Sequence, residues 1–372
     1  MEKFDKLLEY GQSYWLDNLS REIITNGELE NRIKNEGLRG ITSNPKIFMK
    51  AISSGHIYDD QIKALAGEGK KPEEIYEALA IEDIQKACDM LRPVFDASNG
   101  EDGFVSLEVS PYLARETEKT KAEARRLYKE VNRPNCLIKI PGTKEGIPAI
   151  EEMLYEGINI NITLLFSIES YEAVTEAYLK ALERRVEEDK PIDKIASVAS
   201  FFLSRIDVLA DKILHDDVIL QVEGDKKIVA GNLLGETAIA SAKIAYQSFE
   251  KKFSGDRWEK LASKGARVQR PLWASTSNKT DTYRDTRYVE PLIGSHTVNT
   301  MPGETIEAFK DHGRLFPNTV KKDVDDAHRV FDDLKELGVS LKDITDQLVE
   351  EGIGKFVEPF DELLKTVEEE AK

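Results

Sequence analysis

The chain is poor in cysteine and has no long apolar segment. Its 372 residues include only two cysteines, Cys88 and Cys136, which fit a reducing compartment and give no spacing typical of metal ligands. No apolar run approaches the ~18 residues of a membrane span, and the first residues lack the apolar core of a secretory signal. We therefore expect a cytoplasmic protein that has no membrane partner.

Positive charge is also scarce. The chain has 52 Lys and Arg residues against 69 Asp and Glu residues, a net charge of −17 at pH 7. Because nucleic-acid binding depends on Lys and Arg at phosphates, this balance argues against a nucleic-acid partner. The excess of acidic residues is unevenly distributed along the chain, since residues 319–372 carry 16 acidic and 8 basic side chains, a net charge of −8. The remainder is only mildly acidic and could hold a local positive site for a small anion.

The chain is rich in short β-like runs that alternate with long helical patterns. Helical runs such as 116–131 and 169–188 repeat apolar residues at a spacing of three or four, with charges between them. Eight strands with helical crossovers predict an α/β fold of the (β/α)₈ barrel type. A doubly wound sheet is the alternative, but no Gly-rich phosphate fingerprint follows the first strand. The predicted strands are 13–17, 40–43, 104–110, 136–141, 158–166, 195–202, 270–275 and 296–301.

No internal repeat, low-complexity tract or Pro/Gly/Ser-rich linker divides the chain. We therefore expect one barrel domain over residues 1–372, with a helical insertion at about 58–95 and a second insertion at 215–227. Residues 319–372 resemble an acidic helical extension that packs an apolar stripe on the barrel. The plainer interpretation is that the charges of this extension only form a solvated face.

Several predicted strands carry polar residues on one face, because successive side chains of a strand point to opposite sides. In "CLIKIP" Lys139 opposes an apolar face, and in "FVSLEVS" Glu108 does the same. In "ININITLL" Asn161 and Thr163 oppose an apolar set that includes Leu164. If the apolar faces lie under the helices, an ammonium, a carboxylate, amides and hydroxyls converge inside the barrel. The pattern predicts an active site, and the alternative is a buried polar network that only holds the fold together.

Lys139 has the clearest chemical meaning among these residues, because lysine is almost never fully buried without a partner. Burial disfavours the charged form of an amine, and a neutral amine is a nucleophile that forms an imine with a carbonyl substrate. A protonated imine then accepts the electrons of an adjacent C–C bond as that bond breaks. The alternatives are that Lys139 forms a salt bridge with Glu108 or Asp17, or that it binds a phosphate.

Six segments together resemble the transaldolase family. They are "YWLDNLSR", "GITSNP", "SLEVSP", "CLIKIPGTKEG", "INITLLFS" and "SFFLSRID", in the family's order and at roughly its intervals, from residue 10 to about 300. The length and the "LWASTS…TVNTMP" segment are similar to a longer bacterial subfamily. The resemblance implies a class I aldolase-type barrel of the pentose phosphate pathway. Its reaction would move a dihydroxyacetone unit from sedoheptulose 7-phosphate to glyceraldehyde 3-phosphate, giving erythrose 4-phosphate and fructose 6-phosphate.

The resemblance also implies roles for the four catalytic candidates. Lys139 matches the Schiff-base lysine, and Asp17 matches the carboxylate that takes the proton from the substrate C4 hydroxyl. Glu108 and Thr163 match the pair that forms and hydrolyses the carbinolamine through a water. From the residues alone, Asp17 could instead cap a helix, and Thr163 could simply favour a strand.

The same comparison implies roles for the substrate-binding candidates. Asn44 and Asn161 match amides that hold the dihydroxyacetone hydroxyls, although Asn44 could simply initiate a turn. Ser200 and Arg205, in the segment "SFFLSR", are five positions apart, which is the spacing of the corresponding serine and arginine in the family. Arg205 is the expected phosphate contact, since a guanidinium suits bidentate binding, and its alternative is a surface helix residue.

One segment departs from the family pattern. Many transaldolases carry an "ASFR"-like sequence on the seventh strand, whose serine and arginine bind the phosphate, whereas this chain reads "WASTSNK". Ser275 is retained, but the arginine is not. Ser277 or Lys279 is the candidate replacement, and we treat Lys279 as a hypothetical phosphate contact.

Two other functions remain open on the sequence. A simple aldolase that releases dihydroxyacetone belongs to the same family, but its shorter members place a tyrosine where Glu108 stands here. A non-catalytic sugar-phosphate-binding protein would have no need of Lys139 with Asp17 and Glu108. The imine mechanism requires no cofactor, and the five scattered histidines show no zinc-ligand spacing. We therefore expect sugar-phosphate substrates, no metal and activity that survives EDTA, and we leave a homo-oligomer open.

Overall fold

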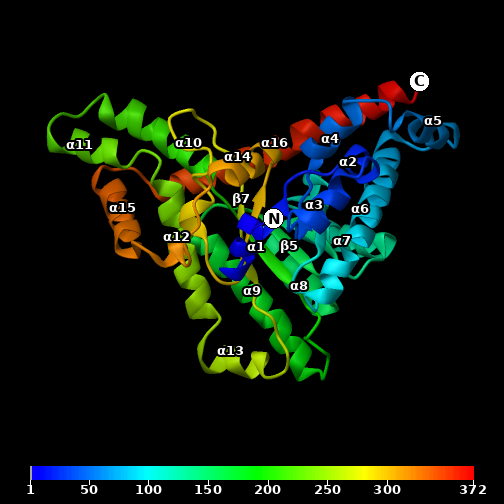
Figure 1. Ribbon diagram of the computed structural model, residues 1–372, viewed down its shortest axis with the longest axis horizontal. Coiled ribbons are helices and arrows are strands. Elements are labelled where there is room, and N and C mark those ends of the chain that lie inside the picture. Colours follow the sequence, from blue (N-terminus) through cyan, green and yellow to red (C-terminus); the bar gives the residue numbers. More distant parts are fainter. Residues whose placement is uncertain (1) are drawn as a thin grey trace.

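The computed structural model describes residues 2–372, and its centre is a closed barrel of eight parallel strands in the order β1 to β8 (Figure 1). The predicted (β/α)₈ barrel is therefore confirmed. The strands are β1 (Gln12–Leu16), β2 (Gly40–Ile41), β3 (Phe104–Glu108), β4 (Cys136–Pro141), β5 (Ile160–Leu165), β6 (Ser197–Phe202), β7 (Arg270–Ala274) and β8 (Thr297–Met301).

Helices fill the connections between the strands and surround the barrel (Figure 1). The α-helices are α1 (Glu2–Glu9), α2 (Arg21–Thr25), α3 (Glu28–Asn35), α4 (Pro45–Ser53), α5 (Asp59–Gly67), α6 (Pro72–Ala97), α7 (Thr117–Val131), α8 (Gly146–Glu156), α9 (Ile168–Glu187), α10 (Ser204–Ile213), α11 (Asp225–Asn232), α12 (Thr237–Lys252), α13 (Gly255–Ala262), α14 (Gly303–His312), α15 (Val324–Glu336) and α16 (Leu341–Glu370). Short 3₁₀ segments are η1 (Pro111–Leu113), η3 (Glu290–Leu292) and η4 (Thr319–Lys321), and η2 (Leu214–Ile219) is π-helical.

Most strands are shorter than the sequence predicts, and the difference lies partly at their carboxyl ends. Asp17, Ser43, Ser110 and Ser275 follow their strands rather than ending them. Ser275 has a φ of 55°, which is outside the range of a regular strand. These residues were predicted as strand because they continue the polar and apolar alternation, whereas the backbone has already turned into a loop.

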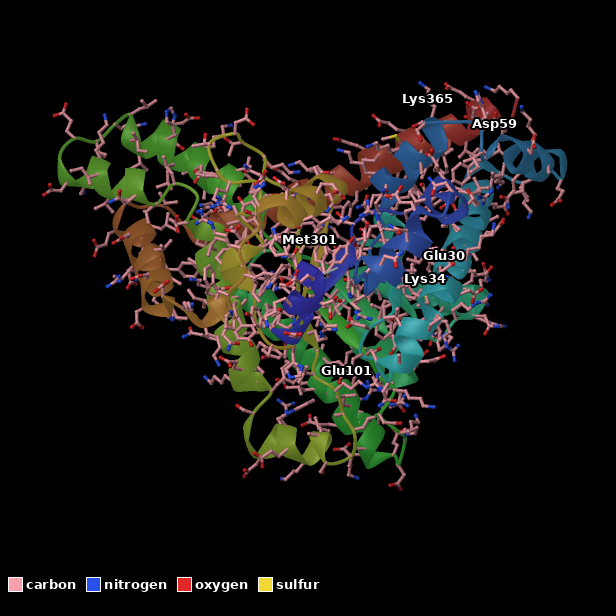
Figure 2. All side chains as sticks on the ribbon, in the orientation of Figure 1. Glu30, Lys34, Asp59, Glu101, Met301 and Lys365 are labelled. Atoms are coloured by element: carbon pink, nitrogen blue, oxygen red, sulfur yellow. The ribbon has the colours of Figure 1, made fainter. Side chains whose placement is uncertain are left out.

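The strands are buried on both faces, as expected for a parallel sheet covered by helices. Each of their residues is buried except Arg270, which is partly exposed at the start of β7. Figure 2 shows Met301 near the middle of the molecule, whereas Asp59 and Lys365 lie at its periphery. One connected cluster of apolar side chains runs from α1 to α16.

The two insertions differ in structure. Residues 58–95 contain α5 and most of the 26-residue α6, which packs against β3. The second insertion, 215–227, starts within η2 and ends in α11, which projects at the left edge of Figure 1.

The C-terminal extension ends in the 30-residue α16, which packs on α4, α6, α10 and the end of β5. Its buried residues repeat every three or four positions, so the predicted apolar stripe is present. They are Ile344, Thr345, Leu348, Gly352, Phe356, Phe360, Leu363 and Val367. Many of its charged side chains, such as Lys365, face solvent. Neither α16 nor any other helix in residues 2–372 has both the length and the apolar character needed to cross a membrane.

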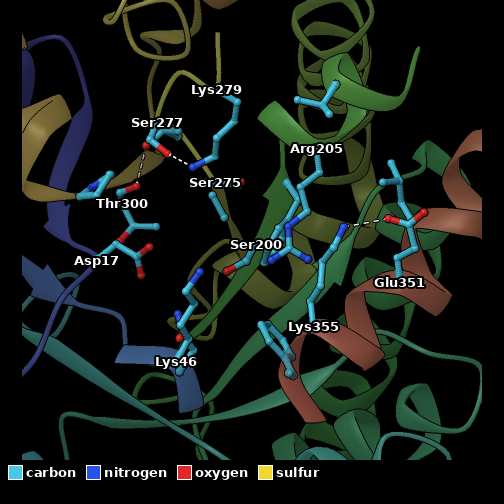
Figure 3. Close-up of a pocket in the computed structure, with 18 of the residues that line it drawn as sticks. Asp17, Lys46, Ser200, Arg205, Ser275, Ser277, Lys279, Thr300, Glu351 and Lys355 are labelled. Carbon is cyan, nitrogen blue, oxygen red and sulfur yellow. Dashed lines mark hydrogen bonds and ion pairs between the residues drawn. The ribbon is translucent and has the colours of Figure 1, made fainter. Parts of the chain in front are cut away.

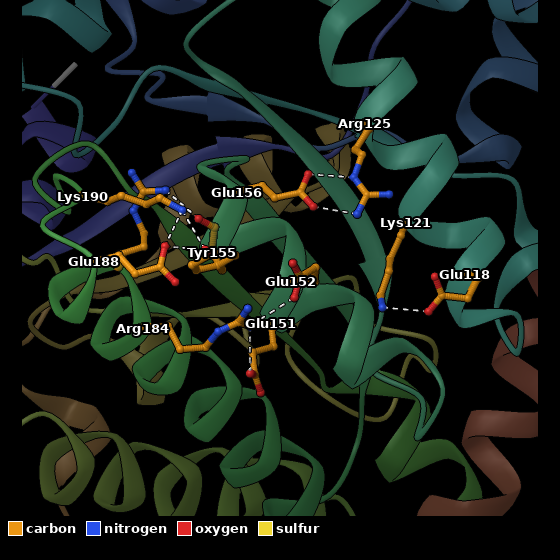
Figure 4. A network of polar contacts seen from close by, with 11 residues as sticks. Glu118, Lys121, Arg125, Glu151, Glu152, Tyr155, Glu156, Arg184, Glu188 and Lys190 are labelled. Atoms are coloured by element: carbon orange, nitrogen blue, oxygen red, sulfur yellow. Dashed lines mark hydrogen bonds and ion pairs between the residues drawn. The ribbon is translucent and has the colours of Figure 1, made fainter.

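Ion pairs join neighbouring helices on one side of the barrel (Figure 4). Arg125 of α7 binds Glu156 of α8 through two hydrogen bonds of 2.7 and 2.6 Å. Arg184 of α9 reaches Glu152 of α8 at 3.1 Å. Exposed pairs of this kind contribute about 0–1 kcal/mol each to stability. They link the helices but add little to the stability of the fold.

Candidate active site

A cavity of about 750 Å³ opens at the carboxyl ends of the strands (Figure 3). This is the end at which barrel enzymes build their active sites, because the loops that follow the strands meet there. Seven of the ten predicted site residues line it: Asp17, Asn44, Lys139, Ser200, Arg205, Ser275 and Lys279. The other three, Glu108, Asn161 and Thr163, are buried and do not line the cavity.

Lys139 enters the cavity wall from the middle of β4, with 6% of its side chain exposed. Its Nζ donates a hydrogen bond of 3.1 Å to the Ser43 carbonyl and lies 5.6 Å from the centre of the Phe356 ring. The register places Glu108 of β3 and Asn161 of β5 directly beside it on the neighbouring strands. The Lys139 side chain is therefore almost completely buried, and it lines the cavity.

Glu108 is the neighbouring carboxylate, and its Oε2 lies 3.4 Å from Lys139 Nζ. Burial raises the pKa of Glu108, and the nearby Lys139 ammonium opposes the rise. Beyond this long ion pair, neither carboxylate oxygen has a hydrogen-bond partner within residues 2–372. The salt-bridge interpretation of Lys139 thus describes a real contact, but one that leaves both groups available for chemistry.

Asp17 lies immediately after β1, where its backbone N–H donates to the Met301 carbonyl at 2.9 Å. Its Oδ1 accepts a hydrogen bond of 2.7 Å from Thr42, whose hydroxyl lies 2.6 Å from that of Thr300. Burial raises the pKa of Asp17, while Lys139 and Thr42 oppose the rise. The helix-cap alternative is wrong, because Ser20 caps α2.

Below the cavity, Asn161 is held from both sides. Its Nδ2 donates to Ser106 Oγ at 2.9 Å, and its Oδ1 accepts from Ser200 Oγ at 2.7 Å. Thr163 is also fully buried, and its hydroxyl has no hydrogen-bond partner within the described residues. Buried polar atoms without partners are uncommon in proteins and call for an explanation.

The regular alternation along β5 ends after Thr163. Leu164 has a φ of 60°, and the pairing with β6 shifts between Ile162 and Leu165. The prediction that Leu164 continues the apolar face of the strand is therefore wrong. Strict alternation requires extended backbone, and β5 departs from it where α16 packs against its end.

Asn44 and Ser275 each have a local structural partner as well as a place at the cavity. Asn44 is the N-cap of α4, and its Oδ1 accepts from the Ile47 N–H at 3.0 Å, which is more than the simple turn considered for it. The Ser275 hydroxyl lies 2.8 Å from that of Ser204 at the start of α10. Both therefore have a fixed orientation at the cavity wall.

Several cations line the cavity in addition to Lys139. Arg205 lies at the start of α10, and its buried Nη1 has no hydrogen-bond partner in residues 2–372. Lys279 donates a hydrogen bond to Ser277. Burial lowers the pKa of both Arg205 and Lys279. The lining also includes Lys46, Lys212 and Lys355, together with the carboxylates Asp17, Glu304 and Glu351.

Some residues that line the cavity were not predicted from the sequence. Thr42 and Thr300 lie within segments that the family resemblance includes, but nothing in their type marked them as partners of Asp17. Lys355 and Phe356 come from α16, far from the other site residues in sequence, so no spacing could indicate them.

No group of three or more His, Cys, Asp or Glu side chains in residues 2–372 is arranged to hold a metal ion.

A sequence model of the Transaldolase/Fructose-6-phosphate aldolase family matches residues 14–367. The chain belongs to this family. It is 48% identical over 376 aligned positions to "Transaldolase 2" of Nostoc sp., covering 99% of this chain and 97% of that protein. It is 47% identical to "Transaldolase" of Trichodesmium erythraeum, covering 97% and 96% of the two chains. It is 45% identical to "Transaldolase" of Thermobifida fusca, with the same coverage. The family resemblance predicted from the sequence is therefore confirmed.

Proposed function

We propose that this chain is a transaldolase, a transferase that moves a dihydroxyacetone unit between ketose and aldose phosphates through a Schiff base on Lys139. The observation that carries the proposal is the nearly buried Lys139 amine at the wall of the barrel cavity, 3.4 Å from Glu108 and electrostatically coupled to Asp17. Family membership supports the same reaction.

In the first step, Lys139 Nζ attacks the C2 carbonyl of the ketose phosphate and forms a carbinolamine, which loses water to give a protonated imine. Glu108, with Thr163, would shuttle the protons of this step through a water. The raised pKa of Glu108 suits a group that both accepts and returns a proton.

In the second step, Asp17 accepts the proton of the C4 hydroxyl as the C3–C4 bond breaks. The bonding electron pair moves into the imine and gives an enamine, and the aldose phosphate leaves. The enamine carbon then attacks the aldehyde of an acceptor aldose phosphate, and Asp17 returns the proton. Hydrolysis at Lys139 releases the new ketose. Because Asp17 must be ionised at the start, the Thr42 hydrogen bond supports its role by favouring the charged form.

The substrate-binding residues divide between the two ends of the ketose. Asn44 lines the cavity, and Asn161 lies beside Lys139 and accepts a hydrogen bond from Ser200. The two asparagines would bind the dihydroxyacetone hydroxyls. Arg205, Ser275 and Lys279 would bind the phosphate. The unpartnered Nη1 of Arg205 is suited to that contact, since a guanidinium binds phosphate oxygens in pairs.

We also propose that the enzyme works in the cytoplasm, within the pentose phosphate pathway. Both cysteines, Cys88 and Cys136, are buried and free, which is compatible with a reducing compartment. A homo-oligomer is compatible with the exposed apolar side chains of the η2–α11 arm, among them Leu220 and Ile228.

The test is an assay with fructose 6-phosphate, run with and without erythrose 4-phosphate as acceptor. A transaldolase forms glyceraldehyde 3-phosphate and sedoheptulose 7-phosphate only when the acceptor is present. Release of glyceraldehyde 3-phosphate and free dihydroxyacetone at the same rate without an acceptor would instead identify an aldolase, the other activity in the family's description. Absence of both reactions would refute the proposal.

A further inference from the structure

We propose that Lys355 of the C-terminal helix α16 binds the substrate phosphate together with Arg205, and so takes part of the role of the arginine that the seventh strand lacks. This inference rests on the proposed function and names a residue of the same site. Lys355 lies more than 200 positions beyond Lys139 in the chain, and no motif pointed to it.

The helix approaches the cavity very closely at Gly352. A Cβ atom at this position would lie 2.9 Å from Leu164 Cδ2 and 3.7 Å from Arg205 Nη1. Glycine therefore allows α16 to pack onto the end of β5 and beside Arg205. One turn later, the Phe356 ring lies 5.6 Å from Lys139 Nζ and 6.0 Å from the Arg205 guanidinium. Helix α16 is thus part of the wall of the cavity.

Lys355 lies between these two anchored positions and lines the cavity, with half of its side chain exposed. Figure 3 shows it rising from α16 toward the side of the cavity that holds Arg205. Its Nζ lies 2.8 Å from Glu351, and Glu351 also acts electrostatically on Arg205. One carboxylate therefore partly balances both cations, and a doubly charged phosphate in the cavity would give each of them a stronger partner.

The other candidate cation acts from a different part of the wall. Lys279 donates to Ser277, the residue that stands where the family has its arginine. Figure 3 places Lys279 and Ser277 on the side of Thr300 and Asp17, away from Glu351 and Lys355. Arg205 with Lys355 on one side and Lys279 on the other would surround the phosphate. A lysine on a flexible stem can move from Glu351 to the phosphate without any displacement of the helix.

Inorganic phosphate is the direct probe, because its binding does not require chemistry. We expect K355M to weaken phosphate binding, measured by isothermal titration, and to raise the KM for fructose 6-phosphate, each by about tenfold, the effect of one charge-assisted hydrogen bond. K355R, which keeps the charge, should restore most of the affinity. The matched control is K342M, because Lys342 is on the same helix and also pairs with an acidic residue one turn away, Asp346, but does not line the cavity.

Equal phosphate affinity in K355M and K342M would overturn the inference. If the wild-type chain transfers dihydroxyacetone while K355M keeps the wild-type KM, the inference fails and the proposed function stands. If the wild-type chain shows no transfer but K355M has lost phosphate affinity, the proposed function fails and the phosphate contact stands.

Discussion

The charge of Asp17 depends on opposing influences that the structure separates. Burial favours its neutral form, whereas the Thr42 hydrogen bond and the Lys139 ammonium favour the carboxylate. A single hydrogen bond can therefore change the pKa of Asp17. The pH dependence of the reaction should change when that hydrogen bond is removed.

We predict that T42V moves the acid limb of the pH profile of kcat/KM to higher pH, by about one unit. The variant removes the 2.7 Å hydrogen bond to the charged form of Asp17, so the pKa of the carboxyl rises further and a larger fraction is protonated at any given pH. The control is T300V, because the Thr300 hydroxyl contacts Thr42 rather than Asp17. An acid limb at the same pH in T42V and the wild type would contradict this account.

We predict that K279A raises the KM for fructose 6-phosphate several-fold and changes kcat much less, because a phosphate contact distant from the reacting carbons mainly affects binding. The control is K365A, at a solvent-exposed lysine on α16. Should the KM of K279A equal that of the wild type in steady-state assays, Lys279 would not be a phosphate contact.

Most of the residues that the sequence identified are polar where the pattern requires an apolar side chain, or they match functional residues of the family motifs. Lys139 and Glu108 were recognisable because an ammonium and a carboxylate interrupt buried strands. Thr42 and Lys355 could not be recognised in this way, because a threonine in a loop and a lysine on a helix are ordinary. Their importance arises only from their neighbours in space.

At the scale of elements, α16 both packs on the barrel and lines the cavity. Its apolar stripe was visible in the sequence as a repeat of three and four. The surface against which the stripe packs was not visible, because nothing in a single sequence aligns a C-terminal helix with the end of β5. The backbone irregularity at Leu164 was not visible either, because nothing in the local sequence marks a positive φ there.

The two glycines of α16 provide an internal comparison. A Cβ at Gly352 would meet Leu164 at 2.9 Å, whereas a Cβ at Gly354 would meet nothing within 4 Å. We predict that G352A destabilises the protein by about 1–3 kcal/mol, the usual cost of overpacking, and raises the KM for fructose 6-phosphate. We predict that G354A has no adverse effect or stabilises the fold by up to ~1 kcal/mol, because Ala is the better helix former.

Denaturant unfolding and steady-state kinetics measure both effects. If the two variants have the same midpoint and the same KM, the close approach of α16 at Gly352 is not needed for either folding or substrate binding.

At the scale of the whole molecule, we propose that the chain is a single domain from its first helix to its last. One apolar cluster includes Phe4 of α1, the strands and Val367 of α16. Calorimetry should therefore show one unfolding transition, with no separate melting of α15 and α16. Two resolved transitions would instead indicate that the C-terminal extension folds as an independent unit.

The barrel was predictable because most strands and the helices between them leave periodic signals, and because a closed parallel barrel is the simplest way to bury them. The strand ends were less predictable, because polar residues at the cavity continue the alternation into loops. The least predictable part was the side of the cavity that we propose to bind phosphate, which is assembled from the segment after β7, α10 and α16.

The central claim is that the amine of Lys139 forms an imine with the ketose. Its most direct test is borohydride reduction in the presence of fructose 6-phosphate, followed by peptide mass spectrometry. We predict a stable adduct of the dihydroxyacetone unit or the intact ketose on Lys139, and no adduct at this position in K139R. An adduct on a different lysine, or none on a catalytically active wild-type enzyme, would contradict the account.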